Sequence, residues 1–61
     1  MPNDILLGTE VRDKVTGFAG VAVARAIYLH GTARILIQSH ELHKGKPLAV
    51  WFEEPFVERN N

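Results

Sequence analysis

The sequence predicts an all-β fold, a small barrel of five strands, on the basis of three observations. Two apolar runs, residues 18–29 and 33–38, alternate their side chains with the period of two that a strand imposes. The short connection between them, His30-Gly31-Thr32, contains glycine, as hairpin connections commonly do. The other apolar runs are short and are separated by glycine, proline and polar residues. Residues 18–38 are therefore predicted to form the central hairpin.

A helix over residues 21–29 is the alternative, because alanine and arginine favour helices. Ala22, Ala26 and Leu29 would then share one helical face. Glycines lie on both sides of the run, and valine and isoleucine outnumber leucine within it. These features favour a strand.

The first 20 residues are predicted to contain one strand between two irregular segments. Residues 1–7 are interpreted as a terminal segment lying across the open end of the barrel, and a patch that docks a partner is the alternative. Thr9 to Asp13 read as a short strand in which Val11 points inward. Residues 14–20 read as a turn-rich loop whose glycines can adopt positive φ.

The alternation also assigns a core face to each arm of the central hairpin. On the first arm, the large aliphatic residues that share one parity are predicted to face the core: Val21, Val23, Ile27 and Leu29. The opposite parity carries smaller residues and one aromatic: Ala22, Ala24, Ala26 and Tyr28. On the second arm, Ile35 and Ile37 share a parity with Ala33, and the opposite parity carries Arg34, Leu36 and Gln38. Arg25 shares the core parity, which indicates either a bulge that turns it outward or an ion pair at the rim.

The second half of the chain is predicted to add two strands. Residues 39–47 have the polar, glycine- and proline-containing composition of a loop, and residues 48–52 form a fourth strand. Residues 53–56 contain a proline and read as a tight turn, with one turn of 3₁₀ helix as an option. Val57 and Glu58 form a last short strand before a polar tail, residues 59–61. This is the element pattern of a single SH3-like barrel domain spanning residues 1–61.

Three short motifs resemble a group of small, largely uncharacterised SH3-like proteins encoded by tailed bacteriophages and prophages. The motifs are Val15-Thr16-Gly17-Phe18-Ala19-Gly20, Tyr28-Leu29-His30-Gly31 and Trp51-Phe52-Glu53-Glu54. The resemblance extends over most of the chain from Gly8 to Glu54 and brings no catalytic residues with it. It implies a non-enzymatic binding or regulatory module located in the cytoplasm of a host cell.

A second resemblance implies a different function. The pattern Gly8-x-x-Val11-x-Asp13, followed by Gly17-Phe18-x-Gly20-Val21, looks like the opening of KOW-type domains and implies contact with RNA or ribonucleoprotein. The basic residues for such contact would be Arg12, Lys14, Arg25 and Arg34. However, seven basic and seven acidic residues balance in this chain, whereas nucleic-acid binders usually carry a basic surplus. Any nucleic-acid binding is therefore expected to be weak and steeply salt-dependent.

The composition sets further expectations. A chain of 61 residues buries a small core, and small domains without disulfides often associate with further copies. The absence of cysteine fits a reducing compartment and excludes a cysteine nucleophile. No apolar run approaches the length of a membrane span, and the N-terminus lacks the basic region of a signal peptide. A cytoplasmic homo-oligomer is expected.

Candidates for catalysis or cofactor binding are few, and we expect no catalytic, cofactor or metal site. His40 and His43 with Glu41 between them are close enough in sequence to share zinc, but a solvated loop explains them equally. Glu53 and Glu54 are adjacent on extended chain and point to opposite sides. Plasmid-encoded type II dihydrofolate reductases are similar in size and barrel type. Gln38 lies near a strand end as in that family, yet the Val-Gln-Ile-Tyr pattern is missing.

A protein-binding surface is the favoured interpretation. The alanines flanked by Tyr28 and Leu36 predict a flat apolar shelf suited to a second copy of the chain. Trp51 is predicted to be the main buried aromatic, with Phe18 and Phe56 closing the ends of the barrel. Adjacent strand residues point to opposite sides, so Phe52 would then face outward or cover an end of the barrel. The alternative places Phe52 in the core and Trp51 on the binding surface. The predicted contact residues are Tyr28, Arg34, Leu36, Gln38 and Phe52.

Overall fold

The structure, a computed structural model, describes residues 5–60 and contains one antiparallel sheet of five strands in the order β4-β3-β2-β1-β5. The strands are β1 (Glu10–Asp13), β2 (Ala19–Ala26), β3 (Arg34–His43), β4 (Lys46–Glu53) and β5 (Val57–Arg59). A single 3₁₀ turn, η1 (Glu54–Phe56), precedes β5. The all-β prediction is confirmed.

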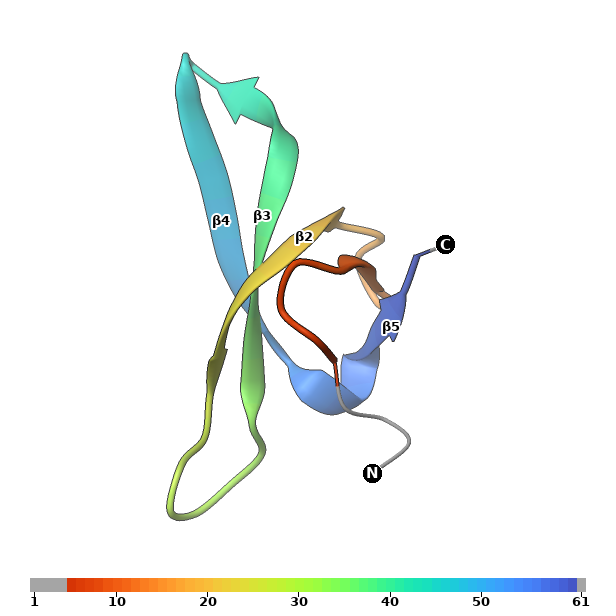
Figure 1. Cartoon of the computed structure of the whole chain (residues 1–61), viewed down its shortest axis with the longest axis vertical. Helices are drawn as coiled ribbons and strands as arrows, with labels where there is room; N and C mark the ends of the chain where they lie inside the picture. Colours follow the sequence, from red (N-terminus) through yellow and green to blue (C-terminus); the bar gives the residue numbers. More distant parts are fainter. Residues whose placement is uncertain (1–4, 61) are drawn as a thin grey trace.

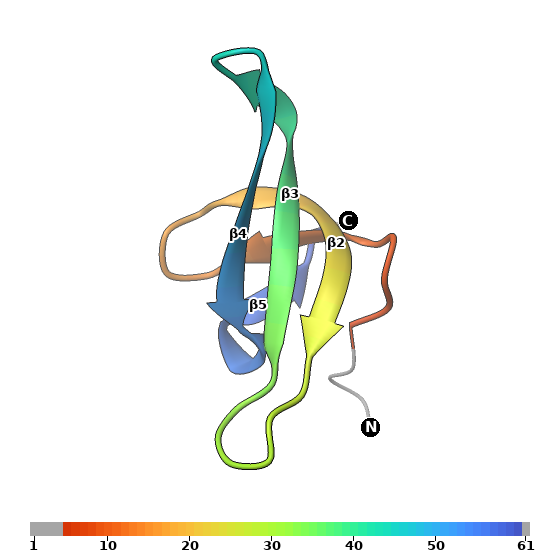
Figure 2. The same ribbon diagram turned by 90° about the vertical axis from the view of Figure 1, so that its left-hand side faces the viewer.

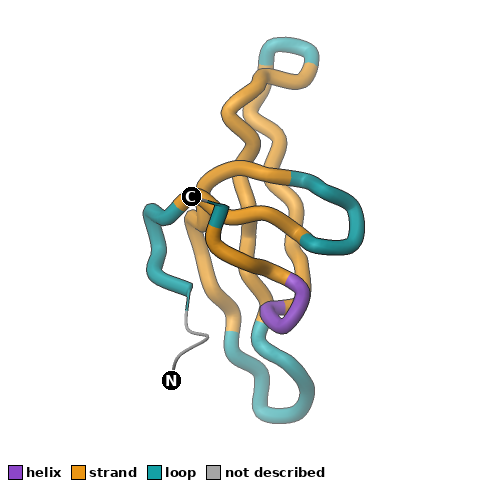
Figure 3. The backbone as a smooth tube through the Cα atoms, turned by 90° about the vertical axis from the view of Figure 1, so that its right-hand side faces the viewer, coloured by secondary structure: helices purple, strands orange, loops and turns teal. Residues whose placement is uncertain are grey.

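The sheet curls back on itself because the two neighbours of β2 pair with different parts of its length. Its first residues pair with β1, and the rest of the strand pairs with β3. Consequently β2, β3 and β4 form one layer, and β1 and β5 lie behind it (Figures 1 and 2). The strands β4 and β5 are the two edges, and the sheet stays open between them. Figure 3 shows the same arrangement from the side of the short strands.

Four of the predicted elements are confirmed with boundaries that shift by one or two residues: β1, β4, η1 and β5. The first arm of the central hairpin is a strand and not a helix, but it ends at Ala26 and not at Leu29. Residues 27–33 form the connection, which is longer than predicted, and Gly31 adopts a φ of 101° there. Ile27 and Leu29 are exposed in this connection, so their predicted place in the core is wrong.

The loop predicted for residues 39–47 is also wrong, because β3 and β4 continue as a long two-stranded hairpin. Leu42 pairs with Pro47 and His43 pairs with Lys46. Lys44 and Gly45 have φ values of 53° and 77°, as in the two-residue turns whose twist matches that of paired strands. The polar composition therefore reflects solvent on both sides of the hairpin, where no core is present to require apolar residues.

The core lies between the β2–β3–β4 layer and the two short strands. Its buried members are Ile5, Val11, Ala22, Ile35, Ile37 and Val57, with Phe18 and Phe52 packed against them. Burial of Ile5 agrees with a terminal segment that covers one end of the fold. The amide of Gly8 donates to the carbonyl of Ala22 at 2.7 Å and holds this segment beside β2. The first four residues of the predicted segment lie outside the described residues.

The core face of β2 is the reverse of the predicted one. Ala22 is fully buried, whereas Val23 is well exposed and Val21 is intermediate. Little room exists on the inner side of the bend: a Cβ atom added to Gly20 would lie 2.1 Å from the carbonyl oxygen of Gln38. Small residues occupy this side because the backbone of β2 approaches β3 too closely for large ones.

A bulge at Val23 changes the parity within β2. Ala22 pairs with Ile37, but Ala24 pairs with Leu36, so one extra residue is inserted between them. Beyond the bulge, Arg25 pairs with Ile35 on the inner side of the sheet. Its guanidinium Nη2 donates to Oε1 of the largely buried Glu54 at 2.8 Å. The ion pair considered for Arg25 is therefore present, but the bulge turns Arg25 to the inner side of the sheet and not outward as considered.

Candidate binding surface

The side of the β2–β3–β4 layer that faces away from the core carries an apolar surface, called the outer face below. Ile35 and Ile37 are fully buried, so Leu36 between them points to the opposite side of β3. Residues paired across antiparallel strands share a face. The outer face therefore has three cross-strand rows: Val21 with Gln38 and Ala49; Ala24 with Leu36 and Trp51; Ala26 with Arg34 and Glu53.

Trp51 forms the centre of the exposed apolar area on this face. It pairs with Leu36 on β3 and is 44% exposed. The next residue, Phe52, pairs with the buried Ile35 and packs against Phe18 with ring centroids 5.4 Å apart. The predicted burial of Trp51 is thus wrong, and Phe52 takes the core position. Of the two aromatics predicted to close the ends of the barrel, Phe18 packs on the core, whereas Phe56 is 46% exposed.

The alternation of residues along β4 predicts the outward orientation of Trp51. Leu48, Val50 and Phe52 share one parity, while Ala49 and Trp51 share the other. The parity with three large apolar residues is the one that faces the core, as period-two alternation predicts. Burial of Trp51 was predicted from the size of its side chain alone, and this alternation contradicts it. Trp51 is thus an exposed aromatic of the outer face, a position that the sequence reasoning considered only as the alternative.

One end of the outer face is framed by a contact between Tyr28 and Arg34. The guanidinium carbon of Arg34 lies 5.6 Å from the centre of the Tyr28 ring, within the range of a cation–π interaction. Both side chains border a shallow hollow that also includes His30 and Glu53. At the other end, Val21, Gln38 and Leu42 border a second hollow beside the long hairpin. The apolar row of Ala24, Leu36 and Trp51 lies between these two hollows.

Four of the five predicted contact residues lie together on this surface, and the fifth does not. Arg34, Leu36 and Gln38 are on the outer face of β3, and Tyr28 reaches Arg34 from the adjoining connection. Phe52 lies on the opposite face of β4, where it contacts the core. The correction follows from the strict alternation of a strand, since Trp51 and Phe52 cannot both point the same way.

The Val-Thr-Gly-Phe motif has a structural role in the loop between β1 and β2. The backbone amide and the hydroxyl of Thr16 donate to Oδ2 of the buried Asp13 at 2.7 and 2.8 Å. The amide of Gly17 donates to the carbonyl oxygen of Asp13 at 2.9 Å, with Gly17 at a φ of 81°. These bonds close the loop and deliver Phe18 to its position beside Phe52.

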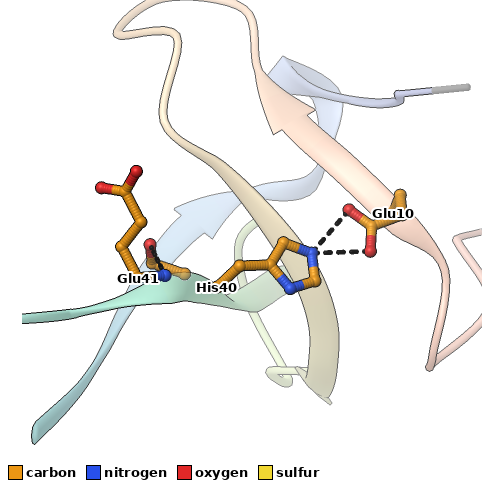
Figure 4. Close-up of polar contacts among 4 residues, drawn as sticks. Glu10, His40 and Glu41 are labelled. Carbon is orange, nitrogen blue, oxygen red and sulfur yellow. Dashed lines mark hydrogen bonds and ion pairs between the residues drawn. The ribbon is translucent and has the colours of Figure 1, made fainter.

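His40 and His43, weighed as zinc ligands, have other surroundings. His40 Nε2 lies 2.7 and 2.9 Å from the two carboxylate oxygens of Glu10, which joins the long hairpin to β1 (Figure 4). His43 lies on β3 beside the hairpin turn and pairs with Lys46. Within residues 5–60, no three histidine or acidic side chains are grouped closely enough to hold a metal ion. The His40 contact is a half-exposed ion pair or hydrogen bond between strands.

The basic residues considered for nucleic-acid contact have varied partners. Arg12 forms an ion pair with Glu58 on β5, and Arg25 forms one with Glu54. Arg34 contacts the Tyr28 ring. Two of the four candidate cations thus have a carboxylate close by, which reduces the local positive potential.

Comparison with known proteins identifies no relative of this chain: no protein family, curated protein or solved structure matches it. The described part of the chain contains no helix long and apolar enough to cross a membrane.

Proposed function

We propose that this chain is a small SH3-like module without enzymatic activity, and that it acts through protein contacts, first of all with further copies of itself. The observation that carries the proposal is the exposed row of Ala24, Leu36 and Trp51 on the outer face. A half-exposed tryptophan among small apolar neighbours is the kind of residue that dominates the energy of protein interfaces.

The strand order supports the SH3-like assignment. A long second strand that pairs with β1 in one half and with β3 in the other, followed by a 3₁₀ turn and a short last strand, gives a curled sheet of the kind found in small barrels. The phage and prophage resemblance in the sequence is consistent with a small regulatory module in a host cytoplasm. It remains part of the proposal.

Self-association is favoured over a small-molecule or nucleic-acid ligand by the character of the surface. The hollows at both ends of the outer face are shallow, whereas pockets for small molecules enclose most of their ligand. The chain has no net charge, so it lacks the long-range attraction that phosphate backbones exert on basic proteins. An apolar surface of this type is buried most simply by a second apolar surface.

The single tryptophan provides a direct test of this proposal. On dilution from millimolar to nanomolar concentration, we expect the Trp51 emission to move to longer wavelength and to become more accessible to a quencher, because the ring returns to water. Ala49→Lys, on the outer face, is expected to remove the concentration dependence. Val15→Lys, on the exposed loop between β1 and β2, is the matched control and is expected to retain it. An emission that stays constant over the whole range would refute the proposal.

A further inference from the structure

The three rows of the outer face contain one positive and one negative side chain, and the two lie side by side. Arg34 on β3 and Glu53 on β4 are cross-strand partners, and such partners point to the same side of a sheet. They lie one row beyond Leu36 and Trp51, because alternate residues of a strand share a face. The two charges therefore stand on opposite sides of the line between β3 and β4.

Arg34 and Glu53 do not neutralise each other. The guanidinium of Arg34 lies over the ring of Tyr28. Within residues 5–60, it forms no ion pair with the carboxylate of Glu53. Both residues are exposed, so each can meet a charged group that approaches the outer face.

A twofold axis that runs parallel to the strands, between β3 and β4, brings the opposite charges of two copies together. When two outer faces stack about this axis, β3 of each copy lies over β4 of the other, and each row lies over the same row. Arg34 of each copy then faces Glu53 of the other. Stacked sheets with aligned strands lie about 10 Å apart, a gap that long side chains of both copies span.

Other ways of stacking the two outer faces leave these charges unpaired or opposed. An axis across the strands, through the central row, reverses the order of the rows. Arg34 would then face Gln38, and Glu53 would face Ala49. An axis along β3 itself would place the two copies of Arg34 over each other. Because like charges repel and a buried charge without a partner is unfavourable, charge complementarity favours the axis between β3 and β4.

We propose that two copies of this chain stack their outer faces about a twofold axis parallel to the strands, between β3 and β4. This inference rests on the proposed self-association and specifies its geometry. Trp51 of each copy lies on Leu36 of the other, and the small Ala24 beside Leu36 leaves room for the indole ring. The ion pair of Arg34 with Glu53 forms twice, as the twofold symmetry requires. Such ion pairs select the orientation of the two copies more than they add affinity.

Charge reversal tests this geometry, because each reversed chain repels itself and attracts the other. With Arg34→Glu alone or Glu53→Arg alone, both contacts between the copies join like charges. We expect either variant to dimerise about tenfold more weakly or worse, as measured by sedimentation equilibrium. An equimolar mixture of the two variants is expected to form a mixed dimer about as tightly as the unmodified chain, because both contacts again join opposite charges. Native mass spectrometry identifies the mixed dimer by its mass.

The matched controls reverse the same charges away from the outer face. Lys14→Glu lies in the loop between β1 and β2, and Glu41→Arg lies in the long hairpin; both positions are exposed. These variants have the same net charges as the test variants and are expected to dimerise like the unmodified chain, alone and mixed. The double variant Arg34→Glu/Glu53→Arg keeps opposite charges side by side and is also expected to dimerise normally. Circular dichroism checks that every variant is folded.

Three outcomes would overturn this geometry while leaving self-association intact. The first is a single reversal at Arg34 or Glu53 that dimerises as tightly as the unmodified chain. The second is a mixture of these two variants that associates no better than each alone. The third is a pair of controls that reproduces the whole pattern. An unmodified chain that stays monomeric at millimolar concentration would overturn both proposals.

Discussion

The two faces of the β2–β3–β4 layer are made from neighbouring residues of the same strands, yet they have different roles. On the inner face, Ile35, Ile37 and Phe52 contact the core formed with β1 and β5. On the outer face, Leu36 and Trp51 alternate with them, and Trp51 is 44% exposed. The difference teaches that apolar character alone does not identify the core of a small sheet. Both faces are apolar, and only the position of the short strands decides which one is covered.

The largest difference between the faces is expected on β3. Ile37→Ala removes a fully buried side chain and should lower the free energy of unfolding by about 4 kcal/mol, because a cavity is left in a small core. Leu36→Ala changes the adjacent residue on the outer face and should cost about 1 kcal/mol. Denaturant titrations at low micromolar concentration, followed by circular dichroism, measure both values. Equal costs for the two variants would show that the faces are not distinguished in this way.

A smaller difference is expected on β4, where the two aromatic residues are adjacent. Phe52→Ala should cost about 3 kcal/mol, since the ring packs against Phe18 and the core. Trp51→Ala should cost only about 1 kcal/mol in the separated chain, because nearly half of the residue surface is already exposed to water. Thermal unfolding of dilute samples compares the two. If Trp51→Ala unfolds the chain and Phe52→Ala does not, the assignment of the two faces is reversed.

Much of the fold was predictable from local patterns. Alternation located the strands, and the Pro55 region located the 3₁₀ turn. The hairpin from Ser39 to Lys46 was not predicted, because most of its residues are polar. They do not cover a core, so the alternation of apolar residues that marks other strands is missing. Backbone hydrogen bonds between β3 and β4 hold these residues in strands, and such bonds cannot be predicted from amino-acid composition.

The faces of β2 were assigned wrongly for a different reason. Large residues were expected inside, but the close approach of Gly20 to Gln38 leaves space only for small ones on the inner side. The bulge at Val23 then shifts the parity so that Arg25 reaches Glu54. Both features depend on how tightly the sheet curls, which is a property of the whole fold. The common side of Arg34, Leu36 and Gln38 on β3 was nevertheless predicted, because their alternation with Ile35 and Ile37 is local.

Sedimentation equilibrium of the unmodified chain tests the central claim most directly, because it reports the mass in solution without any substitution. The single chain has a mass of 6.8 kDa. As the concentration rises from micromolar to millimolar, we expect the weight-average mass to increase from this value toward that of two chains and then to level off. A mass that remains that of one chain at millimolar concentration would contradict the account.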